Sequence, residues 1–182
     1  MKCYKIFDKI FFEEILTSDN TADLIKDNTL NLLILIPEVK YMIGFEHKHP
    51  HHYLDVFEHT LEVIRNLNTN DLELNMAGLF HDIGNPFSYQ DEEVRHFHGH
   101  AKVSYDMTKE ILTRLGYDDE FIGRVSYLVE MHDTLIDPNN LDNNIELVKK
   151  RLLLQYADAK AHHPLYVDAR IRKLDGVKKH LR

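Results

Sequence analysis

The amino-acid sequence contains a single cysteine, Cys3, and no tryptophan among its 182 residues. One cysteine cannot form a disulfide within the chain, which fits a reducing compartment and leaves histidine and carboxylate side chains as candidate metal-binding groups. The sequence also lacks the roughly 20 consecutive apolar residues that a membrane span needs. Its longest apolar run, residues 32–37, is interpreted as core. The first residues of the sequence do not resemble an export signal, because Asp8 interrupts their apolar stretch and no small-residue cleavage pattern follows. We therefore predict a cytoplasmic protein that does not cross a membrane.

The sequence also has fewer basic than acidic residues. There are 22 Lys and Arg residues against 30 Asp and Glu residues, which gives a formal net charge of −8. Such a chain is not expected to offer an extensive nucleic-acid surface, whereas a small phosphorylated molecule is a compatible ligand. Hydrophobic residues make up 43% of the sequence, which suits one domain with a substantial core. No pattern in the chain specifies an oligomeric state.

Apolar residues recur every three to four positions along most of the chain, a spacing typical of amphipathic helices. Glycine and proline mark several helix ends, as at Gly84, Pro86 and Gly116. The sequence has no alternating strand pattern, internal repeat or low-complexity linker. We predict an all-α fold with helices near residues 6–15, 56–67, 72–82, 101–115, 119–131 and 145–161, and a last one beginning at Pro164.

The dipeptide His81-Asp82 follows the apolar residues Leu79 and Phe80 at the end of a predicted helix. An ionised Asp in a protein core costs free energy unless it is paired or bound to a cation. Histidine and carboxylate ligands together suit Mn, Fe, Ni, Co, Zn or Mg. Metal coordination and a local His-Asp hydrogen bond at a helix end are the two interpretations that this dipeptide allows.

Three motifs place this dipeptide in a wider pattern: EHT at residues 58–60, AGLFHDIG at 77–84 and ADA at 157–159. Their order and context resemble the HD phosphohydrolase superfamily, whose fold is an all-α HD-domain helical bundle. In that family the first His, the His-Asp pair and the last Asp coordinate a divalent metal. The resemblance therefore implies a metal site formed by His59, His81, Asp82 and Asp158.

Further segments are similar to the C-terminal HD domain of bacterial tRNA nucleotidyltransferases: IPE at 36–38, HHYLDVFEHT at 51–60, HGHA at 98–101 and MHD at 131–133. The Gly-Ser phosphate-binding signature and the paired Asp-x-Asp carboxylates of the nucleotidyltransferase half do not occur, so we expect no addition of nucleotides to tRNA. The resemblance implies a metal-dependent phosphatase or 2′,3′-cyclic phosphodiesterase acting on a small nucleotide-like substrate.

On this resemblance residues 1–182 form a single HD domain. It divides into an N-terminal helical extension (1–35), an HD core (36–162) and a basic C-terminal helix (163–182). The basic residues of the last helix could form a partner-binding face, but we interpret them as solvated surface, because charge runs usually are. They are Arg170, Arg172, Lys173, Lys178, Lys179 and Arg182.

The resemblance also draws attention to His100 and His132, which stand where two-metal members of the superfamily carry additional ligands. The cofactor is therefore one divalent cation or two. The alternative is that His100 caps its helix and contacts substrate phosphate, while His132 is an ordinary helix-end residue. Together with Asp82, which we expect to orient the attacking water, these histidines are the candidate catalytic residues.

One position departs from the family pattern, which usually reads His-Asp-Ile-Gly-Lys: Asn85 stands in place of the lysine that lies near substrate phosphate. Arg95 is the available replacement cation, because its planar guanidinium suits phosphate. His162 follows Asp158 by four residues and shares its helix face. We predict that Asn85, Arg95 and His162 bind substrate, with a solvated loop or helix-end role as the alternative for Arg95 and His162.

Four more histidines crowd residues 47–52, and we interpret this segment as a polar loop rather than a metal-uptake site. His52 precedes His59 by two helical turns and is expected to support it. Two other functions fit the same residues. A regulatory module that keeps metal and nucleotide binding but has lost turnover is suggested by Asn85, and a di-iron HD-type oxygenase is chemically allowed.

Overall fold

The computed structural model describes residues 8–90, 93–139 and 144–181, and within these ranges the chain is helical with no strand. The all-α prediction is therefore confirmed. Cys3, Ile6, Phe7 and Arg182 lie outside the described residues. The helices in chain order are α1 (Lys9–Leu16), α2 (Thr21–Asp27), α3 (Thr29–Leu35), the 3-10 helix η1 (Pro37–Tyr41), α4 (Val56–Leu67), α5 (Leu72–Phe80), α6 (Asn85–Ser88), α7 (His100–Arg114), α8 (Asp119–Glu130), α9 (Ile145–Ala161) and α10 (Pro164–Lys178).

Aspartate N-caps fix the start of the central helices. The Asp55 carboxylate accepts a hydrogen bond from the Glu58 amide at 2.8 Å and begins α4, and Asp71 does the same for α5 through the Leu74 amide at 3.0 Å. Asp118 caps α8 in the same way. An Asp at this position satisfies a backbone N–H that has no partner within the helix. These caps set where each helix begins, and hence where the side chains at its other end lie.

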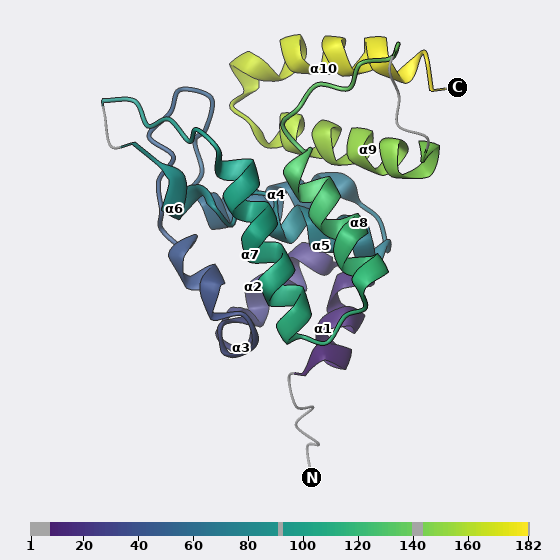
Figure 1. Ribbon diagram of the computed structural model, residues 1–182. Coiled ribbons are helices and arrows are strands. Elements are labelled where there is room, and N and C mark those ends of the chain that lie inside the picture. Colours follow the sequence, from purple (N-terminus) through teal and green to yellow (C-terminus); the bar gives the residue numbers. More distant parts are fainter. Residues whose placement is uncertain (1–7, 91–92, 140–143, 182) are drawn as a thin grey trace.

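Helix α5 lies at the centre of the molecule, packed by α4, α8 and α9 (Figure 1). All of its residues from Leu74 to Phe80 are buried. Its one buried amide side chain, that of Asn75, donates hydrogen bonds to the Leu16 and Thr69 carbonyls at 2.7 Å each, which satisfies both of its N–H groups. Because this helix points into the core, His81 and Asp82 at its end are held in the interior of the protein.

Helices α9 and α10 run side by side across one end of the bundle, while α1, α2 and α3 cover the other end (Figure 1). A small apolar cluster joins α9 and α10 to the chain that follows α8. The apolar run at residues 32–37 is core only in part: Leu32 and Ile36 are buried, but Ile34 is 81% exposed. Among the described residues no helix is long and apolar enough to span a bilayer.

Gly84 lies where the turn after Asp82 meets the start of α7. A Cβ at this position would lie 2.6 Å from the Ser104 amide nitrogen and 2.9 Å from the His100 carbonyl oxygen, both backbone atoms. The Gly84 amide also donates a hydrogen bond to the Ser104 hydroxyl at 2.9 Å. The absence of a side chain therefore allows α7 to approach, and with it His100.

We predict that Gly84→Ala lowers the free energy of unfolding by about 1–3 kcal/mol, because the added methyl group forces α7 away from the turn. Chemical denaturation measures the change. Gly123→Ala is the control, since a Cβ at Gly123 of α8 meets no atom within 4 Å and the helix should tolerate alanine. Equal stability of the Gly84 variant and wild type would contradict this account of the close approach.

Candidate metal centre

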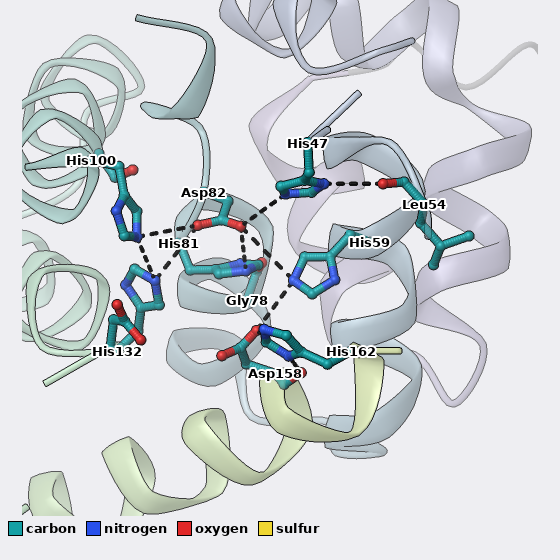
Figure 2. Close-up of polar contacts among 12 residues, drawn as sticks. His47, Leu54, His59, Gly78, His81, Asp82, His100, His132, Asp158 and His162 are labelled. Carbon is teal, nitrogen blue, oxygen red and sulfur yellow. Dashed lines mark hydrogen bonds and ion pairs between the residues drawn. The ribbon is translucent and has the colours of Figure 1, made fainter. Parts of the chain in front are cut away.

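The Asp82 carboxylate lies at the centre of a ring of imidazoles, and each of its oxygens faces a different group (Figure 2). It is 5% exposed. The distances from Oδ2 to Nε2 atoms are 3.4 Å for His81 and 3.8 Å for both His47 and His59, and those from Oδ1 are 3.6 Å for both His100 and His132.

The four residues for which the sequence predicts a metal site come from three parts of the fold. His59 lies on α4, His81 and Asp82 follow α5, and Asp158 lies on α9. Ligand atoms of His59, His81 and Asp82 all lie within 4.8 Å of one another. Asp158 joins them through His59, whose Nε2 is 3.2 Å from Asp158 Oδ1. The structure thus brings all four predicted ligands into one buried region.

The histidines on the other side of Asp82 form a second group. Ligand atoms of Asp82, His100 and His132 also lie within 4.8 Å of one another. His100 is the first residue of α7 and His132 follows α8, and their Nε2 atoms are only 3.2 Å apart. Asp82 therefore belongs to both groups and could bridge two cations.

Backbone carbonyls fix the tautomers of these imidazoles. Nδ1 lies 2.8 Å from the carbonyl oxygen three residues earlier for His81 and His100, and 2.6 Å for His132. A carbonyl oxygen can only accept, so Nδ1 must donate and the lone pair of a neutral ring is on Nε2. This arrangement orients metal-binding histidines in general. With Nδ1 donating in both rings, the Nε2 atoms of His100 and His132 face each other at 3.2 Å, and a cation could bind to both of them.

His47 is a residue that the sequence pattern does not predict at this centre. Its side chain is almost fully buried, its Nδ1 donates to the Leu54 carbonyl at 3.0 Å, and its Nε2 has no hydrogen-bond partner among the described residues. His52 stacks on His47 with ring centroids 3.9 Å apart, and its ring centroid is 4.9 Å from that of His59. The expected support of His59 thus comes from the loop that precedes α4 rather than from a shared helix face.

Arg170 on α10 is a second residue that the sequence pattern does not place here. Its Nη2 donates to Asp158 Oδ2 at 2.8 Å and to Asp133 Oδ1 at 3.0 Å, and its Nη1 donates to His162 Nε2 at 3.3 Å. The interpretation of the basic C-terminal helix as solvated surface is wrong for this residue. Arg170 neutralises Asp158 and leaves its other oxygen directed at His59.

A cavity of about 360 Å³ opens onto this centre, and we call it the metal cavity. Of the three residues predicted to bind substrate, Asn85 lines its wall with a buried Oδ1 that has no hydrogen-bond partner among the described residues. Arg95 also lines it, with its guanidinium against the rings of Phe45 and Tyr89 and Nη1 donating to the Glu46 carbonyl at 2.6 Å. His162 lines it too, but its Nδ1 donates to the Asp158 carbonyl at 2.8 Å and its Nε2 faces Arg170.

Comparison with known proteins agrees with this geometry. The family model of the HD domain matches residues 51–171. The chain belongs to the HD domain family. It is 33% identical over 157 residues to the A-adding tRNA nucleotidyltransferase of Deinococcus radiodurans, an alignment that covers 79% of this chain and 36% of that protein. It is 34% identical over 106 residues to the CC-adding tRNA nucleotidyltransferase of Thermus thermophilus, covering 54% of this chain and 24% of that one.

This HD domain therefore spans only about a third or less of the relatives that it matches. The matched region reaches into α10 and includes Arg170. The division of the chain into an extension, an HD core ending at residue 162 and a separate basic helix stays a prediction.

Burial and charge act in opposite directions on the ionisable groups of this HD domain. Burial alone would raise the pKa of Asp82, but neighbouring imidazoles, His81 above all, hold it well below the usual range. Burial opposes protonation of His81, yet the Asp82 carboxylate outweighs burial and raises the pKa of His81 to about 9. For His59 burial prevails over the nearby carboxylates and lowers the pKa. Without metal, His81 carries a proton at neutral pH while His59 is neutral.

We predict that the affinity for Mn²⁺ rises with pH, because a metal ion must displace the His81 proton. The increase should approach tenfold per pH unit from about pH 6.5 to about 8 and level off near 9, the raised pKa of His81. Isothermal titration calorimetry in two buffers of different ionisation enthalpy measures affinity and proton release together. An affinity that does not change with pH would contradict this assignment.

The folding stability of the metal-free protein should depend on pH in the opposite direction from the metal affinity, and should fall as the pH rises. Because the folded-state pKa of His81 lies above its unfolded value of 6.5, the contribution of this group to stability is fully present below pH 6.5. It is lost as the pH rises through about 9. Thermal unfolding of metal-free and metal-loaded samples over this pH range therefore compares the two opposite effects directly.

Proposed function

We propose that this HD domain hydrolyses a phosphate ester of a small, nucleotide-like molecule and uses two divalent cations that share Asp82. The observation that carries the proposal is the placement of a separate imidazole group at each oxygen of this buried carboxylate. A two-metal phosphatase centre holds its cations close together and leaves an open approach for substrate, and the metal cavity offers such an approach.

The donor set supports a transition metal. Imidazole nitrogen with carboxylate oxygen suits Mn, Fe, Co, Ni or Zn, while Mg prefers oxygen ligands. The buried Nε2 atom of His47 has no hydrogen-bond partner among the described residues, which is costly unless an ion binds there. When bound, such ions would lower the pKa of a coordinated water and neutralise charge on the phosphoryl oxygens.

The lining of the metal cavity explains why phosphate binding should depend on those cations. Its carboxylates are Asp82, Asp133 and Asp158, whereas its guanidinium groups are Arg95 and Arg170. The carboxylates outnumber the arginines, so the protein alone does not favour an anion there. Arg95 lines this cavity and is the side chain that we propose to hold an outer phosphoryl oxygen. Asn85 replaces a family lysine and would offer a hydrogen bond without charge.

The chain's own groups have distinct proposed roles. Asp82 accepts a hydrogen bond from the attacking water and so orients it. His100 and His132 would hold the cation on the more open side of Asp82. The His100 side chain is 17% exposed, whereas the other imidazoles that face Asp82 are at most 3% exposed. His162 supports Arg170 rather than contacting phosphate, since its Nε2 accepts from that guanidinium.

The test is a panel of nucleoside monophosphates and 2′,3′-cyclic phosphates assayed with Mn²⁺, with and without chelator. We expect release of inorganic phosphate or ring opening that stops on chelation and returns with metal. The same rates are expected in the absence of oxygen, which separates hydrolysis from a di-iron oxygenase reaction. Tight nucleotide binding without any product would contradict hydrolysis and favour a regulatory module.

Arg170 gives a further prediction. Arg170→Met leaves the buried Asp158 carboxylate without its guanidinium, so the metal-free variant should lose about 2 kcal/mol of stability, or roughly 5 °C in Tm. Mn²⁺ should raise the Tm of this variant more than that of wild type, because the cation then neutralises Asp158. Arg172→Met on the exposed face of α10 is the control for thermal unfolding. A loss that metal does not reduce would show that Arg170 acts only in helix packing.

A further inference from the structure

A second cavity, of about 340 Å³, lies beside the metal cavity, and we call it the side cavity. It lies between α10 and the chain after α8, which runs up toward that helix in Figure 1. Its lining residues are His51, Asp133, Leu135, His162, Tyr166, Ala169, Arg170 and Lys173. Four of them, His51, Asp133, His162 and Arg170, also line the metal cavity, so the two spaces share a wall.

The two cavities differ in chemistry. The metal cavity is lined almost entirely by imidazole, carboxylate and guanidinium groups. The outer part of the side cavity is mostly apolar, with Leu135, Tyr166 and Ala169 on its walls. Leu135 is 64% exposed and Tyr166 is 38% exposed, although large apolar side chains are more often buried. An apolar space that adjoins a phosphate-binding centre fits the carbon-rich part of the same ligand.

One stripe of α10 forms a wall of the side cavity. Tyr166, Ala169, Arg170 and Lys173 follow one another at helical spacing and therefore lie on one face. Arg170 is directed to the metal centre, where it donates to Asp158. Ala169 beside it has the smallest side chain of the stripe and leaves room for a ligand. Lys173 places a positive charge at the opposite end of the stripe from Tyr166.

Aromatic rings border the side cavity next to the metal centre. The ring centroids of Tyr166 and His51 are 4.1 Å apart and the rings meet at an angle of 51°, so they form a corner rather than a closed stack. The His163 amide donates to the His51 carbonyl at 2.7 Å and fixes the turn before α10 against the histidine loop. Flat rings bind well against such aromatic walls, because every nucleobase has a π-face.

We propose that the side cavity binds the organic group of the phosphate ester, a flat aromatic ring such as a nucleobase, while the phosphate lies in the metal cavity. This inference rests on the proposed phosphohydrolase function and assigns its substrate class. Selectivity for the ring would come from Leu135, Tyr166 and Ala169, none of which contacts the predicted metal ligands in the way that Arg170 does.

The experiment compares the binding of adenosine 5′-monophosphate with that of inorganic phosphate, both titrated calorimetrically into the Mn²⁺-loaded protein. Wild type should bind the nucleotide roughly 10- to 100-fold more tightly, the range that stacking of one base gives. Ala169→Phe fills the side cavity and should remove most of this preference while leaving the phosphate affinity and the metal content unchanged. Tyr166→Ala should weaken nucleotide binding, and Tyr166→Phe should retain it.

Gly176→Phe is the matched control. Gly176 lies two turns further along α10, outside the side cavity, and a Cβ there meets no atom within 4 Å. It should bind both ligands as wild type does. If Ala169→Phe keeps the wild-type preference, or if wild type binds nucleotide and phosphate equally, the side cavity is not the ring subsite. If phosphate does not bind to the metal-loaded protein at all, both this inference and the proposed function are overturned.

Discussion

Asp82→Asn is expected to abolish the binding of both cations and to remove chelator-sensitive hydrolysis. Asparagine has nearly the same size, but it lacks the charge that faces five imidazoles at 3.4–3.8 Å. Loss of a residue that supports a metal ligand costs roughly 10- to 100-fold in affinity, and loss of a bridging ligand should cost at least the upper value. Elemental analysis after gel filtration and the phosphate-release assay measure the two effects.

Asp106→Asn is the control for this variant. Asp106 is an exposed carboxylate on α7 that pairs with Lys102, one helical turn away. It should keep wild-type metal content and activity. The helix content of Asp82→Asn, followed by circular dichroism, should stay close to that of wild type. An Asp82 variant that retains wild-type activity would contradict the proposed centre.

His132→Asn is expected to reduce the bound metal from about two ions per chain to one, and to lower the hydrolysis rate by at least about 100-fold. The asparagine amide can still donate a hydrogen bond to the Val129 carbonyl, as His132 Nδ1 does at 2.6 Å. It has no nitrogen in the place of Nε2, which lies 3.6 Å from Asp82 Oδ1. The ion on the His59 and His81 side should remain.

His180→Asn provides the matched control. His180 also donates from Nδ1 to a backbone carbonyl, that of Gly176 at 2.9 Å, but it is exposed at the end of α10. Its replacement should change neither metal content nor rate. A His132 variant with two ions bound would show that this histidine is an ordinary helix-end residue, the alternative that its sequence allows.

Most of the helical framework is predictable from local signals. Apolar spacing and the glycine and proline residues at helix ends act within a few residues, so α4 and α9 begin and end where the pattern places them. The apolar run at residues 32–37 shows the limit of this reasoning. Hydrophobicity favours burial on average, but Ile34 lies on the outer face of a short helix and is largely exposed.

The residues of the site likewise divide into those that the sequence predicts and those that it does not. His59, His81, Asp82 and Asp158 come from motifs whose order along the chain carries the information, and the structure brings them together. His47 and Arg170 lie in no such motif. The position of His47 depends on how its loop folds over Asp82, and that of Arg170 depends on the packing of α10 against α9. Contacts of this kind are set by tertiary packing, so sequence spacing alone does not reveal them.

The central claim is that Asp82 bridges two cations held by imidazoles on either side. The most direct measurement is anomalous scattering from a crystal grown with excess Mn²⁺. We predict two peaks flanking Asp82, one beside His59 and His81 and the other between His100 and His132. The absence of any peak at Asp82, with these side chains directed apart, would contradict the account.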